Sequence, residues 1–222
     1  MAASDRFDRK ELKEPDPFFE AFGSARQYVD RNRTQVFGSA AAIVAVIALI
    51  AGVTGYLSSS RSSAATDFNS AVSNLEFDSP SAADASLSRV GDRANAGPYA
   101  SLAVLYRANL AADGGRYDEA IKLYDEFIPN AETDYLEQIG LMGKAYALEQ
   151  AGRPAEAAPV LDRAAEIEGP YRKAALNDRA RIAEKAGDKA AAIAALQKLL
   201  EIEGSGAPGA AIERRIEALK AS

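Results

Sequence analysis

The sequence predicts an all-α protein in which one N-terminal transmembrane helix precedes a solenoid of helical hairpins. Residues 34–60 of the 222-residue chain contain no charged side chain. The rest is rich in alanine, has few aromatic residues and shows no run of alternating β-branched residues. Glycine breaks recur in it at intervals of 37 and 35 residues, a period that is typical of stacked helix pairs.

Residues 1–33 form a charged head that we expect to be cytoplasmic. The head holds seven basic and seven acidic residues, so its net charge is zero. Its first stretch is polar and contains two prolines, which predicts a flexible segment. After it, a short amphipathic juxtamembrane helix and a plain connector are both open, and the helix is favoured by the roughly helical spacing of Phe18, Phe19, Phe22 and Val29.

The uncharged stretch 34–60 predicts a transmembrane helix. Its most apolar part, Val36–Leu57, has 22 residues. At about 1.5 Å per residue this part spans about 33 Å, against about 30 Å for a hydrocarbon core. A signal peptide is the weaker alternative, because a 33-residue head precedes the stretch and the apolar run is unusually long for one. We therefore expect an uncleaved signal anchor, with the serines at 58–60 and 62–63 forming a linker after it.

Basic residues near the two ends of this stretch predict its orientation, because Lys and Arg favour the cytoplasmic side. Arg26, Arg31 and Arg33 precede the stretch, whereas only Arg61 follows it before residue 77. We expect a single-pass protein of a bacterial inner membrane with a cytoplasmic N-terminus. Residues 61–222 would then form a periplasmic domain, and the absence of cysteine suits that oxidising compartment.

The composition argues against several classes of function. The chain has no Cys and no His, so thiolate nucleophiles, disulfides and imidazole metal ligands are excluded. A net charge of -6 argues against nucleic acid as a partner. Paired carboxylates such as Asp118-Glu119, Asp125-Glu126 and Glu166/Glu168 are expected to be solvated rather than catalytic. We expect a non-enzymatic protein with no cofactor, no metal and no small-molecule substrate.

Glycine and proline breaks divide residues 61–222 into expected helices. A glycine just past a helix end supplies the left-handed residue that closes the helix. Pro154 and Pro170 suit the first turn of the helix that follows each break. The expected helices span residues 62–77, 81–93, 98–112, 116–128, 133–151, 154–168, 170–186, 189–203 and 208–221.

The breaks align as a repeat when Gly115, Gly152 and Gly187 are superposed. Small residues recur around them where two helices approach closely: Ala108, Ala145 and Ala180 before the glycine, and Ala120, Ala157 and Ala192 after it. Large apolar residues recur where the pair buries a shared face: Val104, Leu141 and Leu176, then Tyr124, Leu161 and Leu196. Three such hairpins are enough to stack into one continuous core.

The segment GRYDEAIKLYDEF, Gly115–Phe127, resembles the second half of a tetratricopeptide repeat. The segments at 152–164 and 187–199 are similar to it more weakly. The resemblance implies a tetratricopeptide-like solenoid. The first halves depart from the pattern, which indicates rotated or lengthened first helices, because basic residues stand where the repeat usually has a packing leucine: Arg107, Lys144 and Arg179.

The layout of the whole chain resembles a bacterial family that includes the ancillary subunit of the Sec translocon. That family also joins a cytoplasmic head and one membrane helix to a tetratricopeptide-like periplasmic domain. The resemblance implies a membrane-anchored scaffold whose protein partners are translocon subunits, periplasmic chaperones or client polypeptides. The alternative is a scaffold of another cell-envelope assembly or of a stress-signalling complex.

In repeats of this type the first helix of each pair lines a concave groove. Apolar, amide and aromatic groups together suit an extended or helical peptide. If the basic residues indicate a different helix rotation, some of the groove residues belong to the core instead. In the common register the groove residues are Leu105, Asn109, Met142, Tyr146, Asn177 and Arg181.

Overall fold

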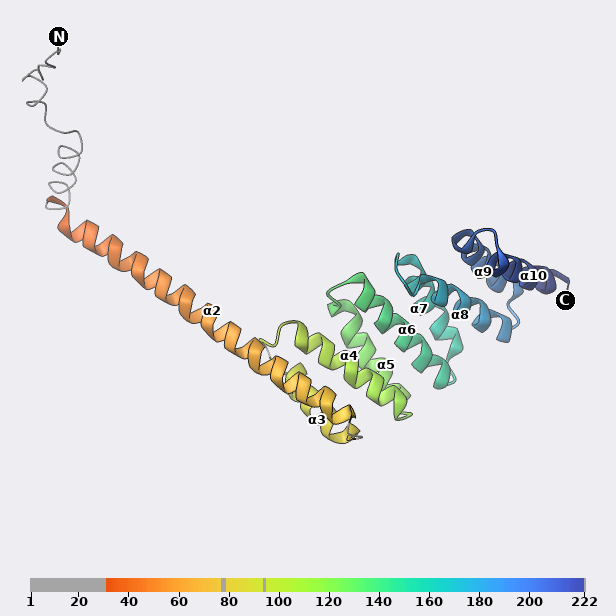
Figure 1. The fold of residues 1–222 in the computed structure, drawn as a ribbon, viewed down its shortest axis with the longest axis horizontal. Coiled ribbons are helices and arrows are strands. Elements are labelled where there is room, and N and C mark those ends of the chain that lie inside the picture. Colours follow the sequence, from red (N-terminus) through yellow and green to blue (C-terminus); the bar gives the residue numbers. More distant parts are fainter. Residues whose placement is uncertain (1–30, 77–78, 94, 222) are drawn as a thin grey trace, which may run out of the picture. The chain divides into compact units, whose positions relative to one another are not determined.

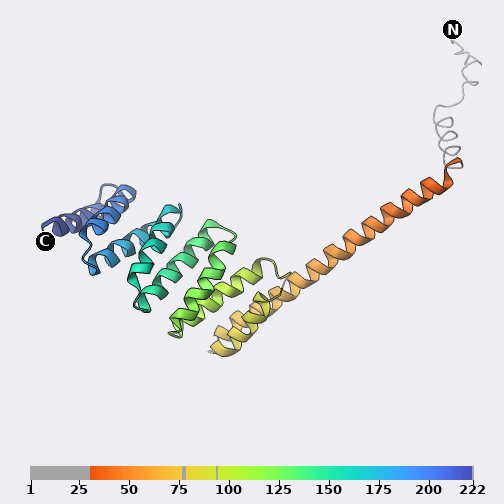
Figure 2. The ribbon, with the colours of Figure 1, turned by 180° about the vertical axis from the view of Figure 1, so that it is seen from behind.

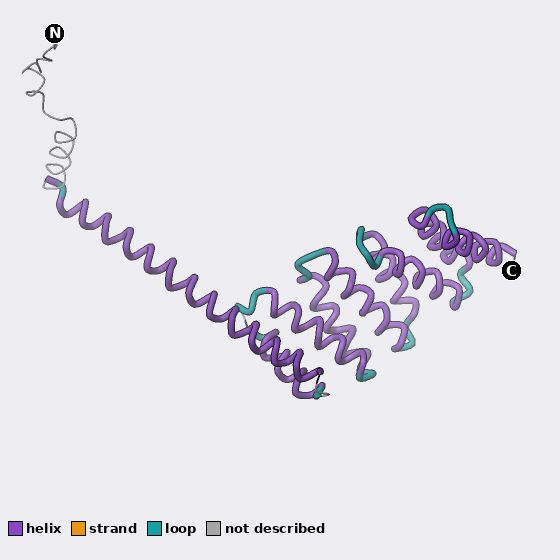
Figure 3. The backbone as a smooth tube through the Cα atoms, in the orientation of Figure 1, coloured by secondary structure: helices purple, strands orange, loops and turns teal. Residues whose placement is uncertain are grey.

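The structure, a computed structural model, describes residues 31–76, 79–93 and 95–221, with the side chains of 33–41 and 76 outside the description. Every regular element in these ranges is a helix, which confirms the all-α class (Figures 1 and 3). The predicted juxtamembrane helix of the head lies outside the described residues. The elements are α2 Arg33–Glu76, α3 Pro80–Gly91, α4 Pro98–Asp113, α5 Tyr117–Phe127, η2 Ile128–Asn130, α6 Asp134–Gln150, α7 Pro154–Glu166, α8 Arg172–Lys185, α9 Lys189–Glu203 and α10 Ala207–Ala221.

Helix α2 runs without interruption from the uncharged stretch to Glu76. The predicted linker at residues 58–63 is therefore wrong, because these residues are helical. They include neither glycine nor proline, and serine is only slightly less favourable in a helix than alanine. Just beyond them, the Thr66 hydroxyl donates to the Ser62 carbonyl at 3.1 Å, so a polar side chain is satisfied within the helix.

The chain divides into two units between Leu57 and Ser58. In the N-terminal unit, α2 exposes large apolar side chains such as Val44 and Leu49. Among the described residues, Ala42–Leu75 contains a segment long and apolar enough to cross a membrane by length and composition. The hydroxyl of Thr54 donates to the carbonyl of Ile50 at 2.8 Å, which satisfies it as a lipid environment requires.

The helical hairpins of the C-terminal unit close with the same turn three times. In each turn the aligned glycine has a positive φ: 73° at Gly115, 75° at Gly152 and 75° at Gly187. The next residue then donates its N–H to the carbonyl five positions earlier: Arg116 to Ala111 at 2.8 Å, Arg153 to Leu148 at 2.8 Å and Asp188 to Ala183 at 2.9 Å. This closure uses a left-handed residue that glycine adopts without a Cβ penalty, and it confirms the predicted repeat.

Of the two prolines predicted to lie in the first turn of a helix, one does. Pro154 is the first residue of α7, as predicted. Pro170 instead lies in the turn before α8, because α8 begins at Arg172. Two starts carry side-chain caps: Thr133 accepts from the N–H of Leu136 at 3.2 Å, and Asp188 accepts from that of Ala191 at 3.0 Å.

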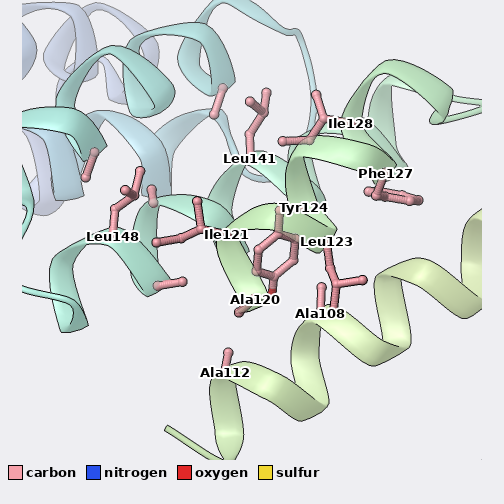
Figure 4. Close-up of a cluster of buried hydrophobic side chains, with 14 of the residues drawn as sticks. Ala108, Ala112, Ala120, Ile121, Leu123, Tyr124, Phe127, Ile128, Leu141 and Leu148 are labelled. Atoms are coloured by element: carbon pink, nitrogen blue, oxygen red, sulfur yellow. The ribbon is translucent and has the colours of Figure 1, made fainter. Parts of the chain in front are cut away.

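The predicted core residues are buried, and Figure 4 shows those around α5. The alanines at the two aligned small positions are all buried, so the paired helices approach closely there. The contact of α5 with α6 is closer still. A Cβ on Gly143 would lie 2.4 Å from the Tyr124 hydroxyl oxygen, and one on Gly140 would lie 2.7 Å from the Phe127 ring. Both positions of α6 therefore require glycine in this packing.

The basic residues that replace the packing leucines form an equivalent ion pair in each repeat. Each pairs with an aspartate of the preceding helix: Arg107 with Asp84 at 2.9 Å, Lys144 with Asp125 at 2.5 Å and Arg179 with Asp162 at 3.1 Å. The alanines that follow them in sequence are buried in all three repeats. The first helices therefore share one rotation, and the departure from the pattern places a charge at the boundary between successive hairpins.

Candidate partner-binding face

The C-terminal unit has two layers of helices. Helices α4, α6, α8 and α10 form one layer, which we call the A layer, and α5, α7 and α9 form the other (Figures 1 and 2). Helices α4, α6 and α8 each contact the α-helix before and the α-helix after them along the chain, α10 contacts α9, and α4 also contacts α6. The six residues predicted to line a groove all lie in this layer: Leu105 and Asn109 on α4, Met142 and Tyr146 on α6, and Asn177 and Arg181 on α8.

Leu105 does not line a surface, which corrects its assignment to the groove. It is 4% exposed and belongs to the main core cluster. The reason is that α4 buries a wide face, on which Val104, Leu105 and Ala108 are all in the core. Met142, at the same register on α6, is only half-buried, and Asn177 on α8 is exposed.

Asn109 is exposed, and its amide oxygen also accepts a hydrogen bond from a buried side chain. The Tyr124 hydroxyl donates to Asn109 Oδ1 at 2.6 Å. Burial raises the pKa of Tyr124 to about 12, and the negative charge of Asp113 adds to the effect. Tyr124 therefore stays a neutral donor, and Asn109 satisfies a hydroxyl that the core would otherwise leave unpaired.

Helix α6 carries a line of large side chains that we call the α6 stripe: Tyr135, Ile139, Met142 and Tyr146. Their spacing of four, three and four residues places them on one helix face. The two tyrosines are each 50% exposed, and Ile139 and Met142 between them are half-buried. Tyr135 and Ile139 are not among the residues predicted from the sequence, although their spacing from Met142 and Tyr146 was a signal for them.

The stripe ends at an aromatic pair. The ring of Tyr135 lies 5.9 Å from that of Tyr171, with 36° between their planes. Tyr171 immediately precedes α8, so the pair joins the starts of two neighbouring A helices. Tyrosines in this arrangement offer an apolar ring face and a hydroxyl to a partner.

Arg181 is held in an ion-pair cluster. Its two terminal nitrogens donate to the two Glu149 carboxylate oxygens at 2.5 and 2.8 Å, and Lys185 donates to the same carboxylate at 2.9 Å. Asp178 is the second carboxylate on Arg181, at 3.0 Å. The cluster borders a cavity of about 50 Å³ that brings together three of the predicted residues: Met142, Tyr146 and Arg181.

Asn177 takes part in a second cross-link of the A layer. Arg215 on α10 donates to Asn177 Oδ1 at 2.9 Å and to both carboxylate oxygens of Glu184 at 2.7 and 3.0 Å. The pair Glu184–Arg215 repeats the pair Glu149–Arg181 one hairpin further on. Ion pairs therefore link the helices at the C-terminal end of the A layer, whereas the exposed face of α6 carries apolar side chains.

The Glu149 cluster predicts a pH dependence of stability. Hydrogen bonds from Arg181 hold the pKa of Glu149 at about 2, below its ordinary 4.5. A pKa lowered by folding stabilises the protein above the ordinary value, and this stability is lost as pH falls from 4.5 towards 2. We expect Glu149→Gln to lower the free energy of unfolding at pH 7 by about 1 kcal/mol, the upper range for an ion pair that solvent screens. The loss of stability as pH falls below 4.5 should also become smaller.

Urea unfolding of the full-length protein at pH 7, 4 and 3 measures this effect. Glu213→Gln, on the exposed face of α10, is the matched control and should follow the parent protein at each pH. If the free energy of unfolding of Glu149→Gln fell as steeply between pH 7 and pH 3 as that of the parent, the role of the cluster would be contradicted.

The paired carboxylates that the sequence placed in solvent make ion pairs there. Glu119 pairs with Arg116 at 2.8 Å and Glu168 with Arg172 at 2.8 Å. No group of three or more carboxylates in the described ranges could hold a metal ion. The chemistry that the face offers is non-covalent: apolar contact on α6, aromatic faces and amides.

A two-layered stack of hairpins with a periodic core defines a helical-repeat protein, a class that typically binds other proteins without catalysis. The chain belongs to the tetratricopeptide repeat-like domain family, which matches residues 26–221. No curated protein matches the sequence.

Solved structures support the same fold. A tetratricopeptide repeat protein from Parabacteroides merdae ATCC 43184 has a TM-score of 0.59 and 16% identity, over 72% of this chain and 61% of its own. A putative kinesin light chain from Podosopora anserina, with nearly identical TPR-like repeats, has a TM-score of 0.54 and 16% identity, over 72% and 86%. At such identities the likeness concerns the fold alone.

Proposed function

We propose that the protein is a membrane-anchored, non-enzymatic scaffold that binds protein partners through its repeat domain. One observation carries the proposal: a single chain combines an exposed apolar helix, long enough to cross a membrane, with a tetratricopeptide repeat-like domain. An anchor raises the local concentration of the domain near membrane complexes, so weak contacts suffice for binding.

The specific form of the proposal is an accessory factor at the Sec translocon of a bacterial inner membrane. In this form the head is cytoplasmic, residues 34–60 cross the membrane once, and residues 61–222 face periplasmic chaperones. The excess of basic residues before the apolar stretch supports the orientation. The order of head, apolar helix and repeat domain supports the assignment to the translocon. The alternative is a scaffold of another cell-envelope assembly or of a stress-signalling complex.

Affinity purification of the tagged full-length protein from mild detergent, followed by mass spectrometry, tests the proposal. We expect Sec channel subunits and periplasmic chaperones to copurify, and their recovery to fall at least tenfold when an unrelated anchor replaces residues 34–60. The matched control is a tagged single-pass protein with that unrelated anchor and a different soluble domain.

The outcomes separate the levels of the proposal. Recovery of a different envelope complex would keep the scaffold and reject the translocon. Recovery of nothing beyond the control would reject the scaffold. Protease added to spheroplasts should digest residues 61–222 and spare the head, and the reverse pattern would overturn the orientation.

A further inference from the structure

We infer that the α6 stripe and the carboxylates at its Tyr135 end form a docking site for an amphipathic helix of another protein, with Lys or Arg at one end of that helix. The inference rests on the proposed scaffold function and adds a surface, a ligand class and a binding direction to it.

The geometry of the stripe favours a helix as the occupant. Tyr135, Ile139, Met142 and Tyr146 repeat the four-and-three spacing that packs one helix along another. At about 1.5 Å per residue, the eleven steps from Tyr135 to Tyr146 extend over about 17 Å, or three helical turns. A partner helix with apolar residues at positions 1, 4, 8 and 11 would match this length.

Charge gives the site a direction. Glu132 lies two residues before α6, Asp134 is the first residue of α6 and precedes Tyr135 in sequence, and both are exposed. Within the described ranges neither carboxylate belongs to an ion pair, whereas the next acidic residue, Glu137, pairs with Arg163 at 2.6 Å. The basic residues at the start of α8 are themselves paired, Arg172 with Glu168 at 2.8 Å and Lys173 with Glu203 at 3.1 Å. This end of the stripe therefore carries uncompensated negative charge.

The aromatic pair adds to the attraction for a cation. The rings of Tyr135 and Tyr171 present electron-rich faces, which attract Lys and Arg side chains. At the other end of the stripe, Tyr146 borders the cluster in which Arg181 and Lys185 share Glu149 and Asp178, so charges there are balanced. A basic residue of the partner is thus attracted to the Tyr135 end of the stripe, and it gains no electrostatic attraction at the Tyr146 end.

The test uses a designed helical peptide of fourteen residues and the full-length protein in detergent, with fluorescence anisotropy as the readout. The probe has leucine at positions 1, 4, 8 and 11, two lysines at one end, and alanine and glutamine elsewhere. One control peptide has the leucines scrambled, and a second has glutamates in place of the lysines. We expect the probe to bind at least tenfold more tightly than either control, with affinity falling as salt rises.

Variants assign the binding to this face. Tyr135→Ala and Tyr146→Ala, both at half-exposed positions, should each lower the affinity for the probe peptide at least fivefold. Neither should change the thermal unfolding curve. The double substitution Glu132→Lys with Asp134→Lys should reverse the preference, so that the glutamate peptide binds more tightly than the lysine peptide. Glu213→Lys, a charge change on α10, is the matched control and should not reverse it.

Several results would overturn the inference. These are equal binding of probe and controls, an unchanged preference after the charge reversal, or probe binding that neither tyrosine variant weakens. Concentration-dependent dimers that Tyr146→Ala abolishes would assign the stripe to a second copy instead, and tight binding of a peptide of residues 17–33 would assign it to the chain's own head.

Copurification separates this inference from the proposed scaffold. Partners that are still recovered with a protein that does not bind the probe would reject the site and keep the scaffold. Probe binding without any copurifying protein would keep the site and reject the scaffold at the membrane.

Discussion

Replacing Phe127 with alanine should lower the free energy of unfolding of the repeat domain by about 3–5 kcal/mol, the range for large buried aromatic residues. Phe127 is 1% exposed and ends α5 (Figure 4). Its ring packs on Gly140 of α6, where a Cβ would lie only 2.7 Å away. Because Gly140 has no side chain, it cannot fill the space that the ring leaves, and we expect a cavity to remain there.

Urea unfolding of the full-length protein in detergent, followed by far-UV circular dichroism, measures this loss. The matched control is Tyr146→Ala, which truncates an aromatic residue that is 50% exposed and should stay within about 0.5 kcal/mol of the parent. A loss below about 1 kcal/mol for Phe127→Ala would show that α5 and α6 collapse onto each other despite the glycines.

The repeat could be predicted from the sequence because its signals are local. A glycine in the left-handed region closes a helix through its own backbone, so Gly115, Gly152 and Gly187 marked three turns without any knowledge of tertiary contacts. Alanines at fixed distances from these glycines then identified the closely packed positions. The expected helices consequently agree with α3 to α10 to within a few residues.

Contacts between distant parts of the chain could not be predicted from the sequence pattern. The pattern places Arg181 in the groove, but it could not show that Arg181 pairs with Glu149, which lies 32 residues away in sequence. Leu105 was assigned to the same groove, although the extent of the buried face of α4 includes it in the core. The serines at 58–63 were read as a linker from composition, whereas the absence of any helix-breaking residue was the stronger signal.

Gln138 was missed for a related reason, since its partners lie at the end of α7 and on the turn after it. It is 0% exposed and is the buried polar residue among the described core positions. Its Nε2 donates to the carbonyls of Ala164 at 3.1 Å and Ile167 at 2.8 Å. A Cβ at Gly169 would lie 2.3 Å from Gln138 Oε1, so this glycine lets the turn close over the amide. The signal in the sequence was a glutamine at the same helical spacing as Leu141 and Ala145.

Replacing Gln138 with leucine should therefore cost about 2–3 kcal/mol of unfolding free energy, even though leucine is apolar and similar in size. The substitution leaves the carbonyls of Ala164 and Ile167 without their donor at the end of α7, and each unpaired buried group costs about 1–3 kcal/mol unless water reaches it. Leucine cannot compensate for this loss, because the substitution removes only the side-chain donor. The backbone carbonyls that accepted its hydrogen bonds stay in place.

Urea unfolding and amide hydrogen exchange together test this expectation. Exchange should accelerate at the start of α8, around Ala175, because Gln138 ties the turn before that helix to α6. Gln150→Leu, an exposed change on the same helix, is the matched control and should leave both measurements within about 0.5 kcal/mol of the parent. A Gln138→Leu protein as stable as the parent would mean that leucine packing offsets the lost hydrogen bonds, and that this turn is fixed by Gly169 rather than by the buried amide.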